Sequence, residues 1–133
     1  MIEKINYKDN LLALIIRKKK YEKKKGINFF TSQNLPLQVA YMQHVKNHKI
    51  QPHIHKKIMR KTYSTPEVLI IKKGRMKVDF YNSKKKYLKS RVLFKDDIIL
   101  LLQGAHGFKV QKDCSFIEVK QGPYKEKSDK DKF

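Results

Sequence analysis

The fold is decided by Pro52-His53-Ile54-His55 and, beyond a basic connector, by Glu67-Val68-Leu69-Ile70-Ile71-Lys72-Lys73-Gly74. Side chains alternate between the two faces of a β-strand, so two histidines at i and i+2 point to the same side. Glu67 opens the next strand and can add a carboxylate beside the two imidazoles. Neutral imidazole and carboxylate groups form a ligand set that suits a divalent first-row metal ion.

A third imidazole stands at the end of another apolar strand. The segment Gly104-Ala105-His106-Gly107 follows the apolar run Ile98–Leu102 almost directly. We therefore expect four side chains to converge on one metal ion, with nitrogen-to-metal distances of about 2.0–2.2 Å. The expected ligands are His53, His55, Glu67 and His106.

Short apolar segments separated by turn residues recur along most of the chain. Strands are expected at Leu11–Ile16, Ile27–Phe30, Leu37–Val45, from Glu67 onward, and at Tyr87–Phe94, Ile98–Leu102, Phe108–Val110 and Phe116–Lys120. Gly74 lies between two alternating segments, which is typical of a hairpin turn. With 133 residues the chain is expected to form one domain with a real core. Many short strands without a long helix indicate an all-β sandwich or barrel.

The order of these residues resembles the two sequence motifs of the cupin superfamily. The first motif resembles HxH, a glutamate, six residues and a glycine, here His53, His55, Glu67 and Gly74. The second resembles an acidic turn, an apolar strand, a bend and a histidine, here Asp97, Ile98–Leu101, Gly104 and His106. Three departures are a longer connector after His55, Leu102 in the usual proline position, and His106 one residue closer to its glycine.

The resemblance implies a cupin jelly-roll β-barrel, also called a double-stranded β-helix. Residues 1–133 would form a single cupin domain. Residues 1–36 would be an N-terminal extension with edge strands, residues 37–121 the jelly-roll core, and residues 122–133 a polar tail.

Within the superfamily, the long connector and the segment Ile117–Tyr124 are similar to small bacterial cupins linked to surface-polysaccharide and nucleotide-sugar genes. This similarity implies isomerisation or epimerisation of a carbohydrate or sugar nucleotide in polysaccharide biosynthesis. One divalent ion (Zn, Fe, Mn or Ni) would act as a Lewis acid. Three alternatives stay open: a metal-free jelly roll with an imidazole base, a metal-dependent dioxygenase, and a non-catalytic sugar-binding or sensing module.

Roles for individual side chains follow from the same interpretation. His53, His106 and Tyr63 are the expected catalytic residues, because an imidazole takes up and releases protons near neutral pH. Arg60, Arg91 and Gln121 are the expected substrate-binding residues. At the end of the last strand, either Lys120 or Gln121 is expected to face into the mouth of the barrel.

The net charge of +20 suggests a polyanionic partner. However, only four of the 32 basic residues are arginine, namely Arg17, Arg60, Arg75 and Arg91. Recognition of base edges and bidentate contacts to phosphate favour arginine, and the lysines are spread along the chain. We therefore expect no specific nucleic-acid partner, only weak, salt-dependent binding to polyanions.

Location and assembly are inferred from the apolar segments and the cysteine content. No segment approaches the ~20 apolar residues of a membrane span, and the single Cys114 suits a reducing cytoplasm. The chain is therefore expected to be cytoplasmic and not bound to membranes. The apolar strand Leu11–Ile16 is expected to pack against or pair with a second subunit in a two-fold homodimer. The alternative is that it folds back onto its own sheet.

Overall fold

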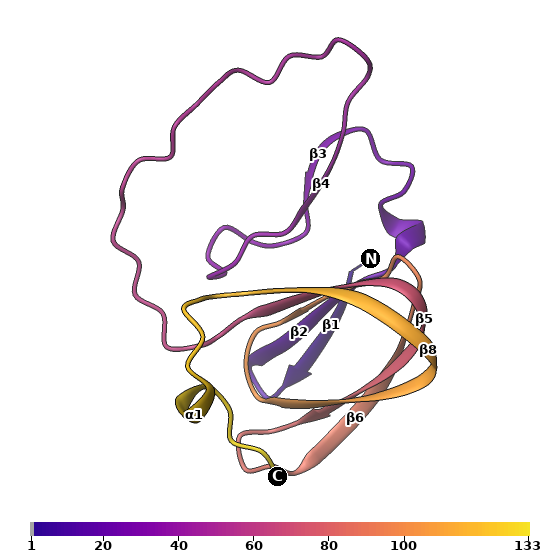
Figure 1. Ribbon diagram of the computed structural model, residues 1–133, viewed down its shortest axis with the longest axis vertical. Helices are drawn as coiled ribbons and strands as arrows, with labels where there is room; N and C mark the ends of the chain where they lie inside the picture. Colours follow the sequence, from indigo (N-terminus) through magenta and orange to yellow (C-terminus); the bar gives the residue numbers. More distant parts are fainter. Residues whose placement is uncertain (1) are drawn as a thin grey trace.

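The computed structural model describes residues 2–133 and consists mainly of antiparallel β-strands. They form a six-stranded sheet and a separate two-stranded hairpin (Figure 1). The strands are β1 (Glu3–Tyr7), β2 (Asn10–Ile16), β3 (Gly26–Phe29), β4 (Ala40–Gln43), β5 (Glu67–Tyr81), β6 (Tyr87–Phe94), β7 (Ile98–Leu101) and β8 (Ala105–Lys120). The helical segments are the 3-10 turn η1 (Lys18–Lys20) and the short helix α1 (Glu126–Asp129). The predicted all-β class agrees with this structure, but the strands within residues 2–133 do not form a closed barrel.

Strand β5 is the centre of the large sheet. On one edge it pairs first with β7, through Glu67–Ile70, and then with β6, through Arg75–Tyr81. On its other edge it pairs with β8 along its whole length, from Glu67 opposite Lys120 to Tyr81 opposite Ala105. The long β5–β8 ribbon curls round, so that its two ends lie near each other (Figure 1).

Gly74 lies at the bend of this ribbon and not in a hairpin turn. The prediction of a turn there is wrong, because β5 continues through Gly74 and its pairing with β8 shifts register on both sides. The backbone of Gly74 has φ +81°, and an added Cβ would lie 1.9 Å from the carbonyl oxygen of Asp113. Only glycine combines this conformation with so close a backbone contact.

The last two predicted strands form one element. Phe108–Val110 and Phe116–Lys120 both belong to β8, which runs through the polar residues between them. These polar residues lie at the bend, where β8 passes Gly74, and are mostly exposed to solvent. The polar stretch that suggested a break between two strands is therefore the outer side of a bend.

Strand β2 is an internal strand of its own sheet. It pairs with β1 on one side and with β7 on the other, and Ala13, Ile15 and Ile16 are completely buried. The expectation that this strand pairs with a second subunit is therefore not met, because Ile98–Leu101 of the same chain occupies its edge. The homodimer itself stays a prediction.

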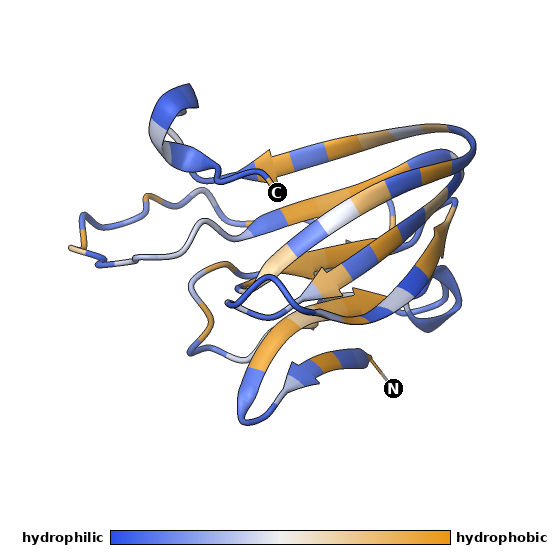
Figure 2. Cartoon of the chain, turned by 90° about the horizontal axis from the view of Figure 1, so that it is seen from below, coloured by the Kyte–Doolittle hydropathy of each residue, from blue (hydrophilic) through white to orange (hydrophobic). Residues whose placement is uncertain are grey.

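Apolar side chains on the two faces of the sheet form two clusters. The first lies inside the curl and includes Leu69, Ile71 and Met76 of β5. The second lies on the opposite face, where Val68 packs with Leu14, Leu100 and Phe30 among others. Figure 2 shows apolar residues concentrated on the strands and hydrophilic residues on the connections. Burial of alternate side chains on opposite faces accounts for the period-2 pattern in the sequence.

Asp97, the acidic residue of the second motif, fixes the turn between β6 and β7. Its side chain is buried and accepts a hydrogen bond of 2.7 Å from Nη1 of Arg17. The backbone N–H groups of Lys18 and Phe94 also donate to this carboxylate, at 3.2 and 3.1 Å. A buried carboxylate is stable when it is paired and hydrogen-bonded in this way. Asp97 therefore has a structural role.

Residues 44–66, which we call the arm, contain no helix or strand. The arm leaves the β3–β4 hairpin, extends well away from the sheet and returns at the start of β5 (Figure 1). Residues 44–63 are all exposed to solvent. In the part of the chain that the structure describes, neither helical segment has the length and apolar composition that a transmembrane helix requires.

Candidate functional site

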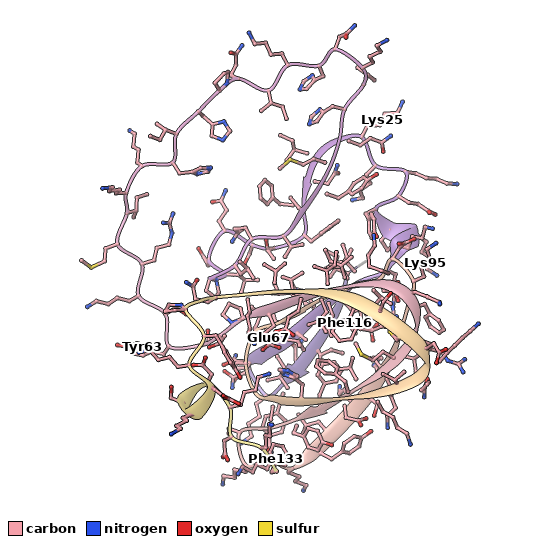
Figure 3. The ribbon with its side chains drawn as sticks, in the orientation of Figure 1. Lys25, Tyr63, Glu67, Lys95, Phe116 and Phe133 are labelled. Atoms are coloured by element: carbon pink, nitrogen blue, oxygen red, sulfur yellow. The ribbon has the colours of Figure 1, made fainter. Side chains whose placement is uncertain are left out.

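Two of the predicted ligands meet inside the curl. Glu67 begins β5, whereas His106 lies near the start of β8 and pairs with Phe80 at the far end of β5. Because the ribbon curls, Nε2 of His106 nevertheless lies 3.2 Å from Oε2 of Glu67. The side chain of Glu67 is 10% exposed and that of His106 is 27% exposed. The pair is thus sheltered but accessible from one side, and Figure 3 shows Glu67 within the ring formed by β5 and β8.

The electrostatic surroundings keep Glu67 ionised. The hydrogen bond from His106 lowers the pKa of the Glu67 carboxyl below its usual value of 4.5, and partial burial opposes this shift. The positive charges of Lys120 and Lys130 lower the pKa of Glu67 further. An ionised carboxylate at this distance fixes the imidazole of His106 in one orientation and favours a proton on its Nε2.

Two adjoining hollows border this pair. The first, of about 390 Å³, is lined by Glu67, the hydroxyl residues Ser64 and Thr65, and the amino groups of Lys120 and Lys130, among others. The second, of about 530 Å³, is lined by His106, Phe108 and the C-terminal residues 130–133. Both volumes lie within the range of small-molecule sites. Asp129 also lines the first hollow, so its side chains of both charges suit a polar ligand.

His53 and His55 do not join this pair. Both lie on the exposed arm, where their rings are 5.2 Å apart and Nδ1 of His53 lies 3.0 Å from the carbonyl oxygen of Gln51. No group of three or more His, Cys, Asp or Glu side chains within residues 2–133 is arranged to hold a metal ion. In this arrangement His53 and His55 lie apart from Glu67 and His106, and metal binding by the four residues stays a prediction.

The remaining predicted site residues lie in different surroundings. Tyr63 lines the first hollow at its rim, with a fully exposed side chain (Figure 3). Arg60 is exposed on the arm. Arg91 lies on β6 and forms an ion pair with Glu3, while Gln121 is exposed and donates a hydrogen bond of 2.9 Å to the carbonyl of Gly122. Only Tyr63 of this set borders the hollow beside Glu67.

Two lysines complete the site. Lys120 lines the first hollow, as expected for one residue at the end of the last strand, and Nζ of Lys120 also pairs with Glu118 at 3.0 Å. Lys130 was not anticipated, because it lies in a polar tail whose sequence carries no signal for its position. It reaches the hollow because the tail folds back past the opening of the curl (Figure 1).

Comparisons with protein-family models, with curated proteins and with solved structures find no match to this chain. The cupin resemblance, with the cytoplasmic location and the role in polysaccharide biosynthesis that go with it, therefore stays a prediction.

Proposed function

We propose that the protein is a small-molecule enzyme that isomerises or epimerises a carbohydrate or sugar nucleotide by proton transfer. One observation carries this proposal: the imidazole of His106 lines one hollow and is held by the ionised carboxylate of Glu67, which lines the adjoining hollow. An imidazole oriented by a carboxylate is a recurrent general base in enzymes. His106 is the base in this proposal, and Glu67 is its positioning partner.

The reaction begins at a carbon next to a carbonyl group of the substrate. His106 removes a proton from this carbon through Nδ1, and the electron pair of the C–H bond moves to the carbonyl oxygen as an enolate. Glu67 stabilises the imidazolium that forms. Protonation of the opposite face of the same carbon by a water molecule, with the proton on His106 passing to solvent, gives the epimer. Return to the former carbonyl carbon, with the neighbouring hydroxyl proton moving between the two oxygens, gives the isomer.

The substrate class is inferred from the polar lining of the first hollow, which adjoins the hollow of His106 because Gly104 and Lys130 line both. Lys120 and Lys130 offer positive charge to a phosphate group or to the developing enolate oxygen. The hydroxyl groups of Ser64 and Thr65 match the hydroxyl groups of a sugar. The net charge of +20 also attracts anionic substrates from solution. A sugar nucleotide meets all three conditions.

Solvent exchange tests the proposal. The protein is incubated in D2O with a panel of keto-sugar nucleotides and reducing sugars, each of which carries a carbonyl group, and mass spectrometry detects deuterium incorporated at carbon. We expect one or more substrates to gain deuterium, and His106→Gln to lower the rate by at least ~100-fold. His44→Gln is the matched control, because His44 is an exposed arm histidine away from Glu67. Equal exchange rates in His106→Gln and the parent would refute His106 as the base.

A divalent metal site is the second candidate function, with Zn, Fe, Mn or Ni as the ion. It is favoured by Glu67 and His106, because a neighbouring carboxylate and imidazole are two of the ligands such an ion needs. A complete set requires His53 and His55 to leave their exposed positions. We expect metal analysis of the parent to find bound metal and the double variant His53→Ala/His55→Ala to lose it. Equal metal content in the two proteins would contradict this candidate.

Measurements with the same panel of substrates distinguish two further alternative functions from proton transfer. A metal-dependent dioxygenase would consume oxygen with its substrate, which an oxygen electrode detects. A non-catalytic sugar-binding or sensing module would bind a ligand in calorimetry without any deuterium incorporation.

A further inference from the structure

The interior of the curl is open on the side of β8. In the part of the chain that the structure describes, β8 pairs only with β5, so its other edge has unpaired backbone groups. Phe108, Val110 and Phe116 are 41%, 56% and 38% exposed, whereas their partners on β5, which are Val78, Met76 and Ile71, are completely buried. Paired residues share one face of a sheet. These three β8 side chains therefore belong to the core face but lack a covering strand.

The β3–β4 hairpin has a second uncovered apolar surface. Ile27 and Met42 lie opposite each other in the pairing of the two strands, and Phe29 lies on the same face. Ile27 and Phe29 are each 59% exposed, and Met42 is 50% exposed. The other face of the hairpin packs on the second core cluster through Tyr41. A two-stranded hairpin is only marginally stable alone, and this one exposes an apolar face to water.

The arm itself is the third uncovered element. Its exposed apolar side chains are Val45, Ile50, Ile54, Ile58 and Met59. Long segments without secondary structure are uncommon inside a compact domain, and those that occur are either functional loops or linkers. The arm is extended and makes no strand pairing of its own (Figure 1). It is available to pair with an unpaired strand edge.

We propose that a second copy of this chain covers these surfaces, with the arm of each copy lying along the free edge of β8 in the other. The exposed backbone groups of β8 need peptide hydrogen-bond partners, which an extended polypeptide supplies by strand addition. Residues 50–59 of the arm would span ~33 Å and β8 spans ~50 Å at about 3.3 Å per residue, so the arm fits the edge.

The hairpin face favours a second copy over the chain's own arm. If the arm folded onto β8 of its own chain, it would cover Phe108 and Val110 but would leave Ile27, Phe29 and Met42 exposed. A two-fold pair of chains exchanges both arms and brings the two hairpins to the same interface. A closed two-fold contact is also the commonest arrangement in homo-oligomers. Exposed apolar side chains and the unpaired backbone groups of β8 favour this dimer independently of the proposed function.

Disulfide trapping between differently tagged chains tests the exchange. Both chains carry Cys114→Ser, which removes the only native thiol. One chain carries a cysteine in the arm, at Ile50, Ile54 or Ile58 in turn, and the other carries Val110→Cys on β8. After co-expression and mild oxidation, we expect a cross-link between the two tags for at least one arm position. Tyr87→Cys on β6 replaces Val110→Cys in the control pair, which should not cross-link.

Sedimentation and a charge substitution complete the test. We expect the parent to sediment as a dimer at tens of micromolar, and Val110→Lys to weaken dimerisation by at least ~10-fold. Phe94→Lys is the matched control, because Phe94 is 51% exposed on β6, outside the proposed interface. A monomeric parent would overturn the proposal. The absence of a cross-link at all three arm positions would overturn it as well. A further chain carries an arm cysteine together with Val110→Cys, and a disulfide that forms within this chain when the two tagged chains form none would also overturn the proposal.

Discussion

Gly74→Ala should be among the most destabilising single substitutions in this chain. Gly74 has φ +81°, where a residue with a Cβ pays ~1–2 kcal/mol. In addition, the new Cβ would lie 1.9 Å from a backbone oxygen of Asp113, so β8 must move away from β5. Forced backbone shifts of this kind cost ~1–3 kcal/mol or more. The free energy of unfolding should therefore fall by roughly 2–5 kcal/mol, a large share of the ~5–15 kcal/mol typical of a domain.

Gly26→Ala is the matched control for Gly74→Ala. Gly26 has a similar φ of +71°, but an added Cβ there meets nothing within 4 Å. This variant should lose only about 1 kcal/mol, since reduced freedom of the unfolded chain offsets part of the strain. The difference between the two variants therefore measures the contact with Asp113.

Urea unfolding followed by far-UV circular dichroism measures both values, because the chain has no tryptophan to report on folding. Ordinary surface substitutions change stability by up to about 0.5 kcal/mol. If the losses of Gly74→Ala and Gly26→Ala differ by no more than this amount, the close contact between Gly74 and Asp113 is refuted. Folded Gly74→Ala protein should also lose deuterium-exchange activity, because the bend brings Glu67 to His106.

Three further predictions follow from individual contacts. Arg17→Ala should lower the free energy of unfolding by about 2–4 kcal/mol, because it leaves the buried carboxylate of Asp97 without its partner. Lys18→Ala, which breaks the exposed ion pair with Asp96, should change the free energy of unfolding by less than ~1 kcal/mol. Equal losses of stability for Arg17→Ala and Lys18→Ala in urea unfolding would contradict this difference. Because the pKa of Glu67 is lowered on folding, its contribution to stability is complete above 4.5 and is lost as the pH falls below that value. As the pH falls, the parent should therefore lose more stability than Glu67→Gln. If stability falls with pH in the same way in both proteins, Glu67 makes no such contribution. Binding to duplex DNA should be weak and should fall steeply with salt; tight, sequence-dependent binding at physiological salt, measured by fluorescence anisotropy, would contradict a solvated lysine surface.

Strands that combine a regular apolar pattern with clear turn residues were predicted well. Tyr87–Phe94 has the bounds of β6, and Ile98–Leu102 is one residue longer than β7. Gly74 was misread because a glycine between two alternating segments is compatible both with a turn and with a bulge inside one strand. The position of Asp113, which is distant in sequence, decides between them, and no local pattern contains it.

The candidate site was predicted in part for a similar reason. Glu67 and His106 meet as expected, although nothing local links them, because the order of the strands determines which ends of the curled ribbon come together. His53 and His55 were expected on a strand, and alternation gives two histidines a common direction only when a partner strand fixes the backbone. Lys130 was missed because its position depends on how the tail folds back.

The arm connects two predicted properties of this protein, which are metal binding and the association of two copies. His53 and His55 can point to one side only if the arm is paired as a strand, and the edge that we propose for it belongs to β8, the strand that carries His106. Metal binding through all four predicted ligands and exchange of arms between two copies would therefore share one structural cause. Proton transfer by His106 has no such requirement, because Glu67 already holds the imidazole within a single chain. A monomeric variant that keeps deuterium exchange but loses metal would separate the two chemistries at this site.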